Sequence, residues 1–210
     1  GKPGRSTYQG LRDTALISLM LCTGLREAEA AGLLMKDLRQ ESGGELGLHI
    51  RKGKGAKERF VPYGELVGVL DIVENWLYEV GLLQDPEAPV FQGFTNGYIS
   101  GKRLGDESTS RARGQLRNKP ISTRAIQDIL KKYPIDIDGV TRTVNPHDLR
   151  RTYARRLYEA GVPIIEIQQN LGHADLKTTQ GYIGNLDMHK RRPPAMFRLP
   201  MMARRGGVNE

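Results

Sequence analysis

Two arginines, two histidines and one tyrosine stand in short motifs spread along the chain. Arg26 ends a Thr-Gly-Leu-Arg run, His147 and Arg150 are three residues apart, and Tyr182 follows His173 by nine residues. Cleavage of a phosphodiester requires cations against the nonbridging oxygens, an activated nucleophile and an acid for the leaving oxygen. Guanidinium groups fit phosphate as planar forks, and a phenol helped by a base can attack phosphorus. These residue types therefore favour a phosphoryl-transfer site.

A lysine supplies the acid that this chemistry still needs. Lys54 lies between Gly53 and Gly55, where a hairpin turn is expected, and an ammonium group crowded by arginines suits proton donation to a departing 5′ oxygen. The sequence has no HExxH motif, no cluster of Cys and His, and only 4 histidines. We therefore expect no metal and no cofactor.

Each of these signals has an ordinary explanation when it is taken alone. An arginine at a helix start is usually a surface residue, and a Gly-Lys-Gly sequence is usually only a turn. A single tyrosine such as Tyr182 is more often a half-buried core or surface residue than a nucleophile. The joint occurrence of the motifs is what favours the chemical interpretation.

Helices and short strands are expected to position these residues. The apolar periodicity and the capping residues predict helices over residues 11–22, 26–34, 66–80, 122–133, 145–160, 164–170 and 175–182. Alternating apolar residues predict strands over 46–50 and around 59–61, with Lys54 at the turn between them. Trp76 belongs to an apolar helix stripe and is expected in the core. We expect residues 95–120 to form a long basic loop and 136–139 a polar turn.

The composition favours a polyanionic partner. With 32 Lys and Arg against 24 Asp and Glu, the net charge is +8, which suits nucleic acid, although a merely basic soluble protein is the alternative. The single cysteine, Cys22, excludes an internal disulfide, and we expect it to be a buried thiol in a reducing compartment. No apolar stretch is long enough to span a membrane, so we expect a cytoplasmic, nucleoid-associated protein.

Taken in order, the motifs resemble the tyrosine recombinases, also called phage integrases. The resemblance runs from Leu11 to Tyr182 through Thr-Gly-Leu-Arg, with Glu29 three residues beyond Arg26, and then through a Gly-Lys-Gly-Ala-Lys-Glu-Arg hairpin followed by Val-Pro, His-x-x-Arg and Leu-Gly-His. Each block is modest, but the ordered set is highly specific. The resemblance implies a mostly helical catalytic domain with a small antiparallel β-sheet, an α+β fold that cradles one face of duplex DNA.

The resemblance also implies a role for each matching residue. By this likeness Arg26 and Arg150 hold the scissile phosphate, while Glu29 orients the first arginine. Tyr182 attacks the phosphate to form a 3′-phosphotyrosyl linkage, and Lys54 protonates the 5′ leaving group. Because the ester is exchanged and not hydrolysed, the likeness implies a reaction without ATP or metal.

Other residues receive supporting roles from the same likeness. His147 and His173 hydrogen-bond the phosphate or help to deprotonate the phenol. Lys57 lies in the same hairpin as Lys54, which matches the family's catalytic position, so Lys57 is assigned to phosphate contact. Arg151, beside the second arginine of the pair, is interpreted as a DNA-backbone contact or a solvated charge.

The likeness suggests how the chain is organised into domains. Residues 1–185 correspond to the catalytic domain, and residues 186–210 resemble a tail that family members pack onto a neighbouring protomer; packing on its own domain is the alternative. The usual N-terminal core-binding domain has no room before Leu11. We therefore expect weak, poorly selective binding of double-stranded DNA by this chain alone, and strand exchange by a homo-multimer on DNA.

Three functions compete at this point. The first is site-specific recombination, or integration, through a covalent protein–DNA intermediate. The second is a noncatalytic DNA-binding or bridging module on the same fold, against which the intact set of motif residues argues. The third is a strand transferase of the type IB topoisomerase kind, which would relax DNA without bringing two sites together.

Overall fold

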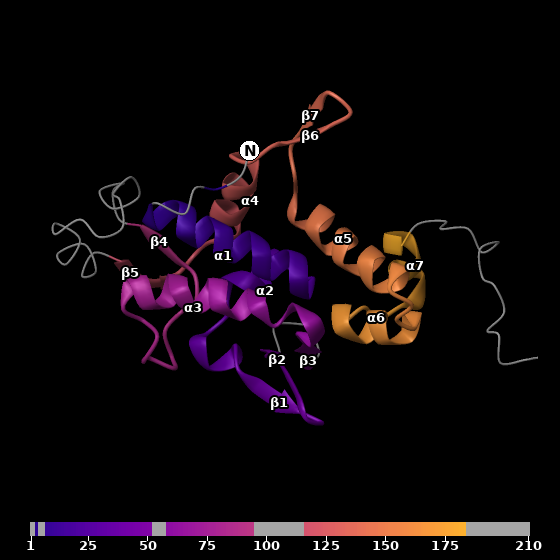
Figure 1. The fold of residues 1–210 in the computed structure, drawn as a ribbon, viewed down its shortest axis with the longest axis horizontal. Coiled ribbons are helices and arrows are strands. Elements are labelled where there is room, and N and C mark those ends of the chain that lie inside the picture. The colour runs from indigo at the N-terminus through magenta and orange to yellow at the C-terminus, as the bar shows by residue number, and fades with distance from the viewer. Residues whose placement is uncertain (1–2, 4–6, 52–57, 95–115, 184–210) are drawn as a thin grey trace, which may run out of the picture.

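The structure, a computed structural model, describes residue 3 and residues 7–51, 58–94 and 116–183, and it is mostly helical with small antiparallel sheets, as the sequence predicts (Figure 1). The described segments contain α1 (Tyr8–Thr23), α2 (Glu27–Ala31), α3 (Gly68–Val80), α4 (Thr123–Lys131), α5 (Pro146–Glu159), α6 (Ile164–Leu171) and α7 (Leu176–Ile183). Every helix expected from the sequence is present. Helix α2 is shorter than predicted, because Gly32 ends it and a 3-10 turn at Met35–Asp37 follows.

The strands form three small antiparallel sheets. One contains β1 (Gln40–Ser42), β2 (Glu45–Ile50) and β3 (Arg59–Pro62) in that order, and the two others pair β4 (Gln92–Phe94) with β5 (Leu116–Pro120) and β6 (Ile135–Ile137) with β7 (Val140–Arg142). Strands β2 and β3 confirm the predicted pair, in register from Gly47 opposite Pro62 to Ile50 opposite Arg59. The predicted turn between them, with Lys54 and Lys57, lies outside the described residues.

Helix α1 is the central element of the core. Thr7 caps its start by accepting a hydrogen bond from the Gly10 N–H at 3.1 Å, and its buried residues pack against α3 and α5. The helix ends at Gly24, whose φ of 63° lies in the left-handed region. A Cβ atom at Gly24 would stand 2.4 Å from Cδ1 of Tyr153 in α5. Glycine is therefore required here both by the backbone and by the close approach of α5.

The described core agrees with most of the sequence-based expectations. Trp76 in α3 is fully buried, its indole donates a hydrogen bond to the Val90 carbonyl at 2.8 Å, and its ring meets Phe94 edge-on. Cys22 is half-buried, so the expectation of a buried thiol is only partly met. It packs against the buried core from the last turn of α1. Among the described residues, no helix is long and apolar enough to cross a membrane.

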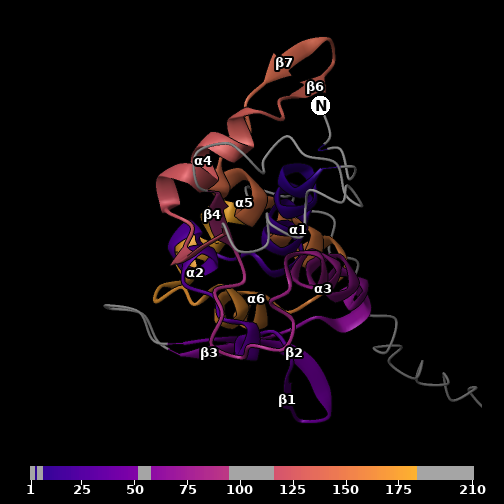
Figure 2. The ribbon, with the colours of Figure 1, turned by 90° about the vertical axis from the view of Figure 1, so that its left-hand side faces the viewer.

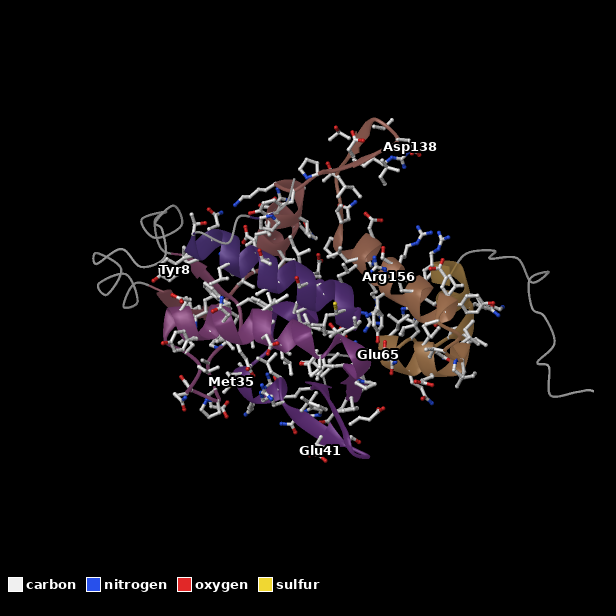
Figure 3. The ribbon with its side chains drawn as sticks, in the orientation of Figure 1. Tyr8, Met35, Glu41, Glu65, Asp138 and Arg156 are labelled. Carbon is white, nitrogen blue, oxygen red and sulfur yellow. The ribbon has the colours of Figure 1, made fainter. Side chains whose placement is uncertain are left out.

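Two predicted loops contain strands. Leu116–Pro120, placed in the basic loop, pairs with β4, and the polar turn around 136–139 is a hairpin that projects from the molecule (Figures 1 and 2). Asp138, at the tip of this hairpin in Figure 3, and Gly139 both have positive φ, 53° and 77°, as a type I′ turn requires. An Asp-Gly pair between alternating apolar residues is a signal for a β-hairpin. The predicted polar turn was therefore correct in position but did not include the two strands. Residues 95–115 lie outside the described residues.

The contact between Gly24 and Tyr153 generates a prediction about stability. Gly24→Ala adds left-handed strain and a steric clash, so we expect it to lower the free energy of unfolding by about 2–4 kcal/mol in urea denaturation. Gly161→Ala is the matched control, because Gly161 has φ 88° but a Cβ there would meet nothing within 4 Å. It should cost about 1–2 kcal/mol through backbone strain alone. Equal losses in the two variants would show that the Tyr153 contact is unimportant.

Candidate active site

Arg150 is buried in the first turn of α5 and joins the ends of two other helices. Asp148 caps the same turn by accepting a hydrogen bond from the Asn145 N–H at 2.9 Å. The Arg150 side chain is only 2% exposed. It donates hydrogen bonds to the carbonyl of Gly24 at 2.5 Å and to that of Leu171. One guanidinium group thus holds the C-terminal end of α1 beside that of α6.

Arg26 stands immediately before α2, three residues after the end of α1. Its backbone N–H donates to Oε2 of Glu29 at 2.8 Å, and its Nη1 donates to Oε1 at 2.9 Å. Nη2 of Arg26 donates to the Gly172 carbonyl at 3.2 Å. Arg150 binds the carbonyl of Leu171, and Arg26 binds the carbonyl of the next residue, Gly172. The two guanidinium groups therefore meet at the C-terminal end of α6. The Arg26 side chain is 39% exposed, so it is the more accessible of the two arginines.

Glu29 and Arg59 form an ion pair beside these arginines. Arg59, in β3, donates from Nη1 and Nη2 to the two Glu29 oxygens, both at 2.8 Å, and from Nε to the Asn170 carbonyl at 2.9 Å. Burial opposes ionisation of Glu29, but the hydrogen bonds and charges of Arg59 and Arg26 outweigh it and lower the pKa to about 2. Glu29 is therefore ionised at neutral pH, with Oε2 lying 4.0 Å from Nη1 of Arg150.

His173 follows Gly172, the left-handed residue that ends α6 with φ 61°. Its Nδ1 lies 3.0 Å from Oγ1 of Thr179, which is fully buried in α7. The imidazole and the ring of Tyr182 are 4.9 Å apart between centroids and inclined at 62°. His173 is thus placed between the carbonyls that anchor the arginines and the tyrosine of α7.

The positive charges change the protonation equilibria of the site. Burial and repulsion by Arg150, Arg26 and Arg59 lower the pKa of His173 to about 4, although Glu29 opposes this change. Burial and repulsion by the other two arginines also lower the pKa of Arg150 to about 10. At pH 7 the arginine is therefore charged and the imidazole is neutral. A neutral imidazole has one donor and one acceptor nitrogen, so His173 can donate a hydrogen bond or accept a proton.

Tyr182 lies in the last turn of α7 with its hydroxyl beside a second histidine. Its Oη is 3.2 Å from Nδ1 of His147, which comes from the first turn of α5, and the two helices are packed together. His147 is exposed and Tyr182 is half-buried. The hydroxyl is consequently held by a possible proton acceptor at a position that solvent can reach.

The structure brings most of the predicted site residues together. Those joined by the contacts above are Arg26, Glu29, His147, Arg150, His173 and Tyr182. Arg151 is exposed on α5, and Lys54 and Lys57 lie outside the described residues. Within 7–51, 58–94 and 116–183, no group of three or more His, Cys, Asp or Glu side chains is arranged to hold a metal ion.

Two residues of the site received no role from the sequence. Arg59 appeared only as a strand residue and as the last residue of the hairpin motif, with no role of its own, although a charged residue in a half-buried strand next to the predicted turn was an available signal. Thr179 was not considered, although it lies three residues before Tyr182 and so on nearly the same side of α7. Both act through contacts with other segments of the chain, which no local motif contains.

A comparison with known families decides the assignment of the chain. The sequence model of the phage integrase family matches residues 5–189, a range that includes every residue of the site described above. The chain belongs to the phage integrase family. The match therefore confirms the resemblance that the ordered motifs indicated.

Phage integrases of known name resemble the chain along most of its length. It is 30% identical over 188 residues to the tyrosine recombinase XerC of Staphylococcus haemolyticus, covering 89% of this chain and 54% of that protein. It is 33% identical over 176 residues to XerC of Xylella fastidiosa, covering 84% of this chain and 49% of that protein. It is 30% identical over 179 residues to XerD of Halalkalibacterium halodurans, covering 85% of this chain and 51% of that protein. The chain spans about half the length of these relatives.

Solved structures show that the integrase fold is shared. XerA recombinase has a TM-score of 0.59 at 24% identity, over 85% of this chain and 54% of that chain. XerH site-specific recombinase, bound to palindromic difH substrate in a post-cleavage complex, has a TM-score of 0.57 at 22% identity, over 86% of this chain and 44% of that chain. These likenesses confirm the predicted fold class.

The low pKa of His173 predicts how stability depends on pH. An unfolded chain binds the His173 proton near pH 6.5, whereas the folded protein binds it only near pH 4, so stability falls as the pH decreases through this window. We expect His173→Gln to remove this part of the pH dependence. The measurement is the free energy of unfolding in urea from pH 4 to 7, with His49→Gln as the control. An unchanged slope in His173→Gln would contradict the assignment.

Proposed function

We propose that this chain is the catalytic part of a site-specific DNA recombinase that cuts and rejoins DNA through a 3′-phosphotyrosyl intermediate. The observation that carries the proposal is the position of the Tyr182 hydroxyl, 3.2 Å from His147 Nδ1, with its ring against His173. Two arginines reach the carbonyls just before His173. The curated relatives, named as tyrosine recombinases, support the same reaction.

The proposed cleavage step divides its requirements among these side chains. Arg26 and Arg150 bind the nonbridging oxygens and stabilise the charge that develops on them. A phenol has an ordinary pKa of about 10 and needs a base close to it, so His147 accepts the Tyr182 proton as Oη attacks phosphorus. The phosphorus–O5′ bond breaks, and Lys54 gives a proton to the departing oxygen. The DNA then carries a free 5′ hydroxyl and a 3′ phosphate esterified to the tyrosine.

The neutral His173 suits a second contact with the phosphate. Its Nδ1 forms a hydrogen bond with Thr179. The other ring nitrogen, Nε2, is left to face the substrate. Because the imidazole is uncharged at pH 7, it can donate one hydrogen bond without adding to the repulsion among the arginines. In this proposal Thr179 fixes the orientation of the ring.

Rejoining reverses the same chemistry with another strand. A 5′ hydroxyl from a second DNA gives its proton to Lys54 and attacks the phosphotyrosine. Tyr182 leaves and takes back the proton held by His147, so no external energy source is required. The net charge of +8 suits double-stranded DNA as the partner, with Arg151 and Lys57 on its backbone. We propose that a homo-multimer brings two sites together, and that residues 186–210 contact a neighbouring protomer while residues 1–185 act as the catalytic domain.

The nucleophile assignment predicts a covalent adduct. We expect the chain to form a denaturant-resistant protein–DNA adduct on nicked duplexes that carry a 5′-bridging phosphorothiolate within a randomised sequence library. Tyr182→Phe should bind the same DNA and give no adduct, because only the nucleophilic oxygen is lost. Tyr158→Phe, on α5, is the matched control and should react normally. An adduct in Tyr182→Phe would disprove the assignment, and DNA binding without any adduct in the unmodified chain would favour a noncatalytic module.

The assignment of Lys54 as the acid predicts a rescue. We expect Lys54→Ala to slow adduct formation on ordinary phosphodiester DNA by about 10²–10⁴-fold, the usual cost of losing a general acid. The same variant should react near the normal rate on phosphorothiolate DNA, since a thiolate leaves without a proton. Lys57→Ala should show no such difference between the two substrates. Equal losses on both substrates in Lys54→Ala would refute the role.

Two assays separate the competing reactions on this fold. A recombinase should convert two sites into exchanged products, whereas an enzyme of the type IB topoisomerase kind should relax supercoiled DNA and yield no exchanged strands. The resemblance to XerC and XerD at 30–33% identity favours recombination.

A further inference from the structure

The Glu29 carboxylate is shared between two arginines. Oε1 accepts hydrogen bonds from Nη1 of Arg59 at 2.8 Å and from Nη1 of Arg26 at 2.9 Å. Oε2 accepts from Nη2 of Arg59 and from the backbone N–H of Arg26, both at 2.8 Å. The two guanidinium groups bind the carboxylate differently. Arg59 donates hydrogen bonds to both oxygens, whereas the Arg26 guanidinium donates to only one of them, through Nη1.

This asymmetry has a consequence for a bound phosphate. A carboxylate held by nothing else would rotate and close on Arg26 in the bidentate geometry that Arg and carboxylate groups prefer. The donors of Arg26 would then be consumed by Glu29 and withdrawn from the DNA. The Arg59 fork fixes the plane of the carboxylate and prevents that rotation.

Arg59 is itself held in one orientation. Its side chain is 8% exposed, and Nε donates to the Asn170 carbonyl at 2.9 Å. Gly172 packs closely against the Arg59 side chain, because a Cβ there would stand 3.0 Å from Nη1 and 3.1 Å from Cδ of Arg59. The carbonyl of the same Gly172 accepts a hydrogen bond from Arg26. Arg59 therefore supports Arg26 both through Glu29 and through the backbone after α6.

We propose that Arg59 is a positioning residue for DNA cleavage: it holds the Glu29 carboxylate so that the Arg26 guanidinium stays available to the scissile phosphate. The inference rests on the proposed function of the same site. Arg59 is too deeply buried to touch DNA, so its effect should appear in the rate of the chemical step and not in the affinity for DNA, which comes from many backbone contacts.

The test measures the first-order rate of adduct formation at saturating phosphorothiolate DNA, together with the Kd for DNA and the unfolding midpoint. Since a misplacement of about 1 Å can cost about 100-fold in rate, we expect Arg59→Gln to react about 100-fold more slowly with a Kd within about threefold of normal. Arg59→Lys should restore only part of the rate, because an ammonium group keeps the charge but cannot grip both oxygens.

Arg51 provides the matched control. It flanks the other side of segment 52–57 and forms its own ion pair with a buried carboxylate, Asp37, at 2.9 Å, with a further hydrogen bond to the Gly32 carbonyl. It makes no described contact with Glu29. Arg51→Gln should therefore keep its rate within about threefold of normal, because the effects of substitutions at sites with no shared contacts are nearly independent.

A double variant distinguishes positioning through Glu29 from a general structural role. If Arg59 acts through that carboxylate, Arg59→Gln should cause little further loss in a Glu29→Gln background, so the two losses should not multiply. The double variant also removes both charges of the buried pair, which keeps the test valid should Arg59→Gln alone fail to fold.

Each outcome separates this inference from the proposed function. Rates in Arg59→Gln equal to those of Arg51→Gln, a loss found wholly in Kd, or multiplying losses in the double variant would overturn the positioning role while leaving recombination intact. If the unmodified chain forms no adduct, the proposed function is refuted. The positioning role of Arg59 then falls as well, because Arg26 would have no scissile phosphate to bind.

Discussion

One half-buried carboxylate, that of Glu29, allows three guanidinium groups to share a small volume. Arg26, Arg59 and Arg150 repel one another, and burial together with this repulsion lowers the pKa of Arg150. Glu29 offsets part of this repulsion by accepting hydrogen bonds from two of them and lying 4.0 Å from the third. Backbone carbonyls at the ends of α1 and α6 satisfy further donors. A fixed negative charge at this point therefore lowers the electrostatic cost of gathering the three cations.

Helix ends bring the remaining groups to this charge cluster. Arg26 precedes α2, His147 lies in the first turn of α5, His173 follows the glycine that ends α6, and Tyr182 lies in the last turn of α7. Termini expose backbone groups that need partners, and they allow the chain to change direction over one or two residues. A site assembled from termini can therefore combine side chains that are distant in sequence while the helices behind them stay rigid.

Local signals predicted the helices and the motif residues, but not the contacts that couple them. Asn145 caps the start of α5 and Gly172 caps the end of α6, so both positions followed from the sequence. The start of α5 in turn placed His147 and Arg150 near each other on that helix. The role of Arg59 was missed because its partner, Glu29, is 30 residues away in a different element. Strand β5 was missed for a similar reason, since its pairing with β4 spans a segment with no apolar periodicity.

Arg150 serves the architecture as much as the chemistry, because its nearly inaccessible guanidinium fastens the ends of two helices. Loss of that side chain would leave the carbonyls of Gly24 and Leu171 without these hydrogen bonds, whether or not the protein is reactive. His147 and Tyr182 carry no comparable structural duty, since one is exposed and the other half-buried. When inactive relatives are sorted from active ones, the accessible imidazole and phenol are therefore more informative markers than the arginine beneath them.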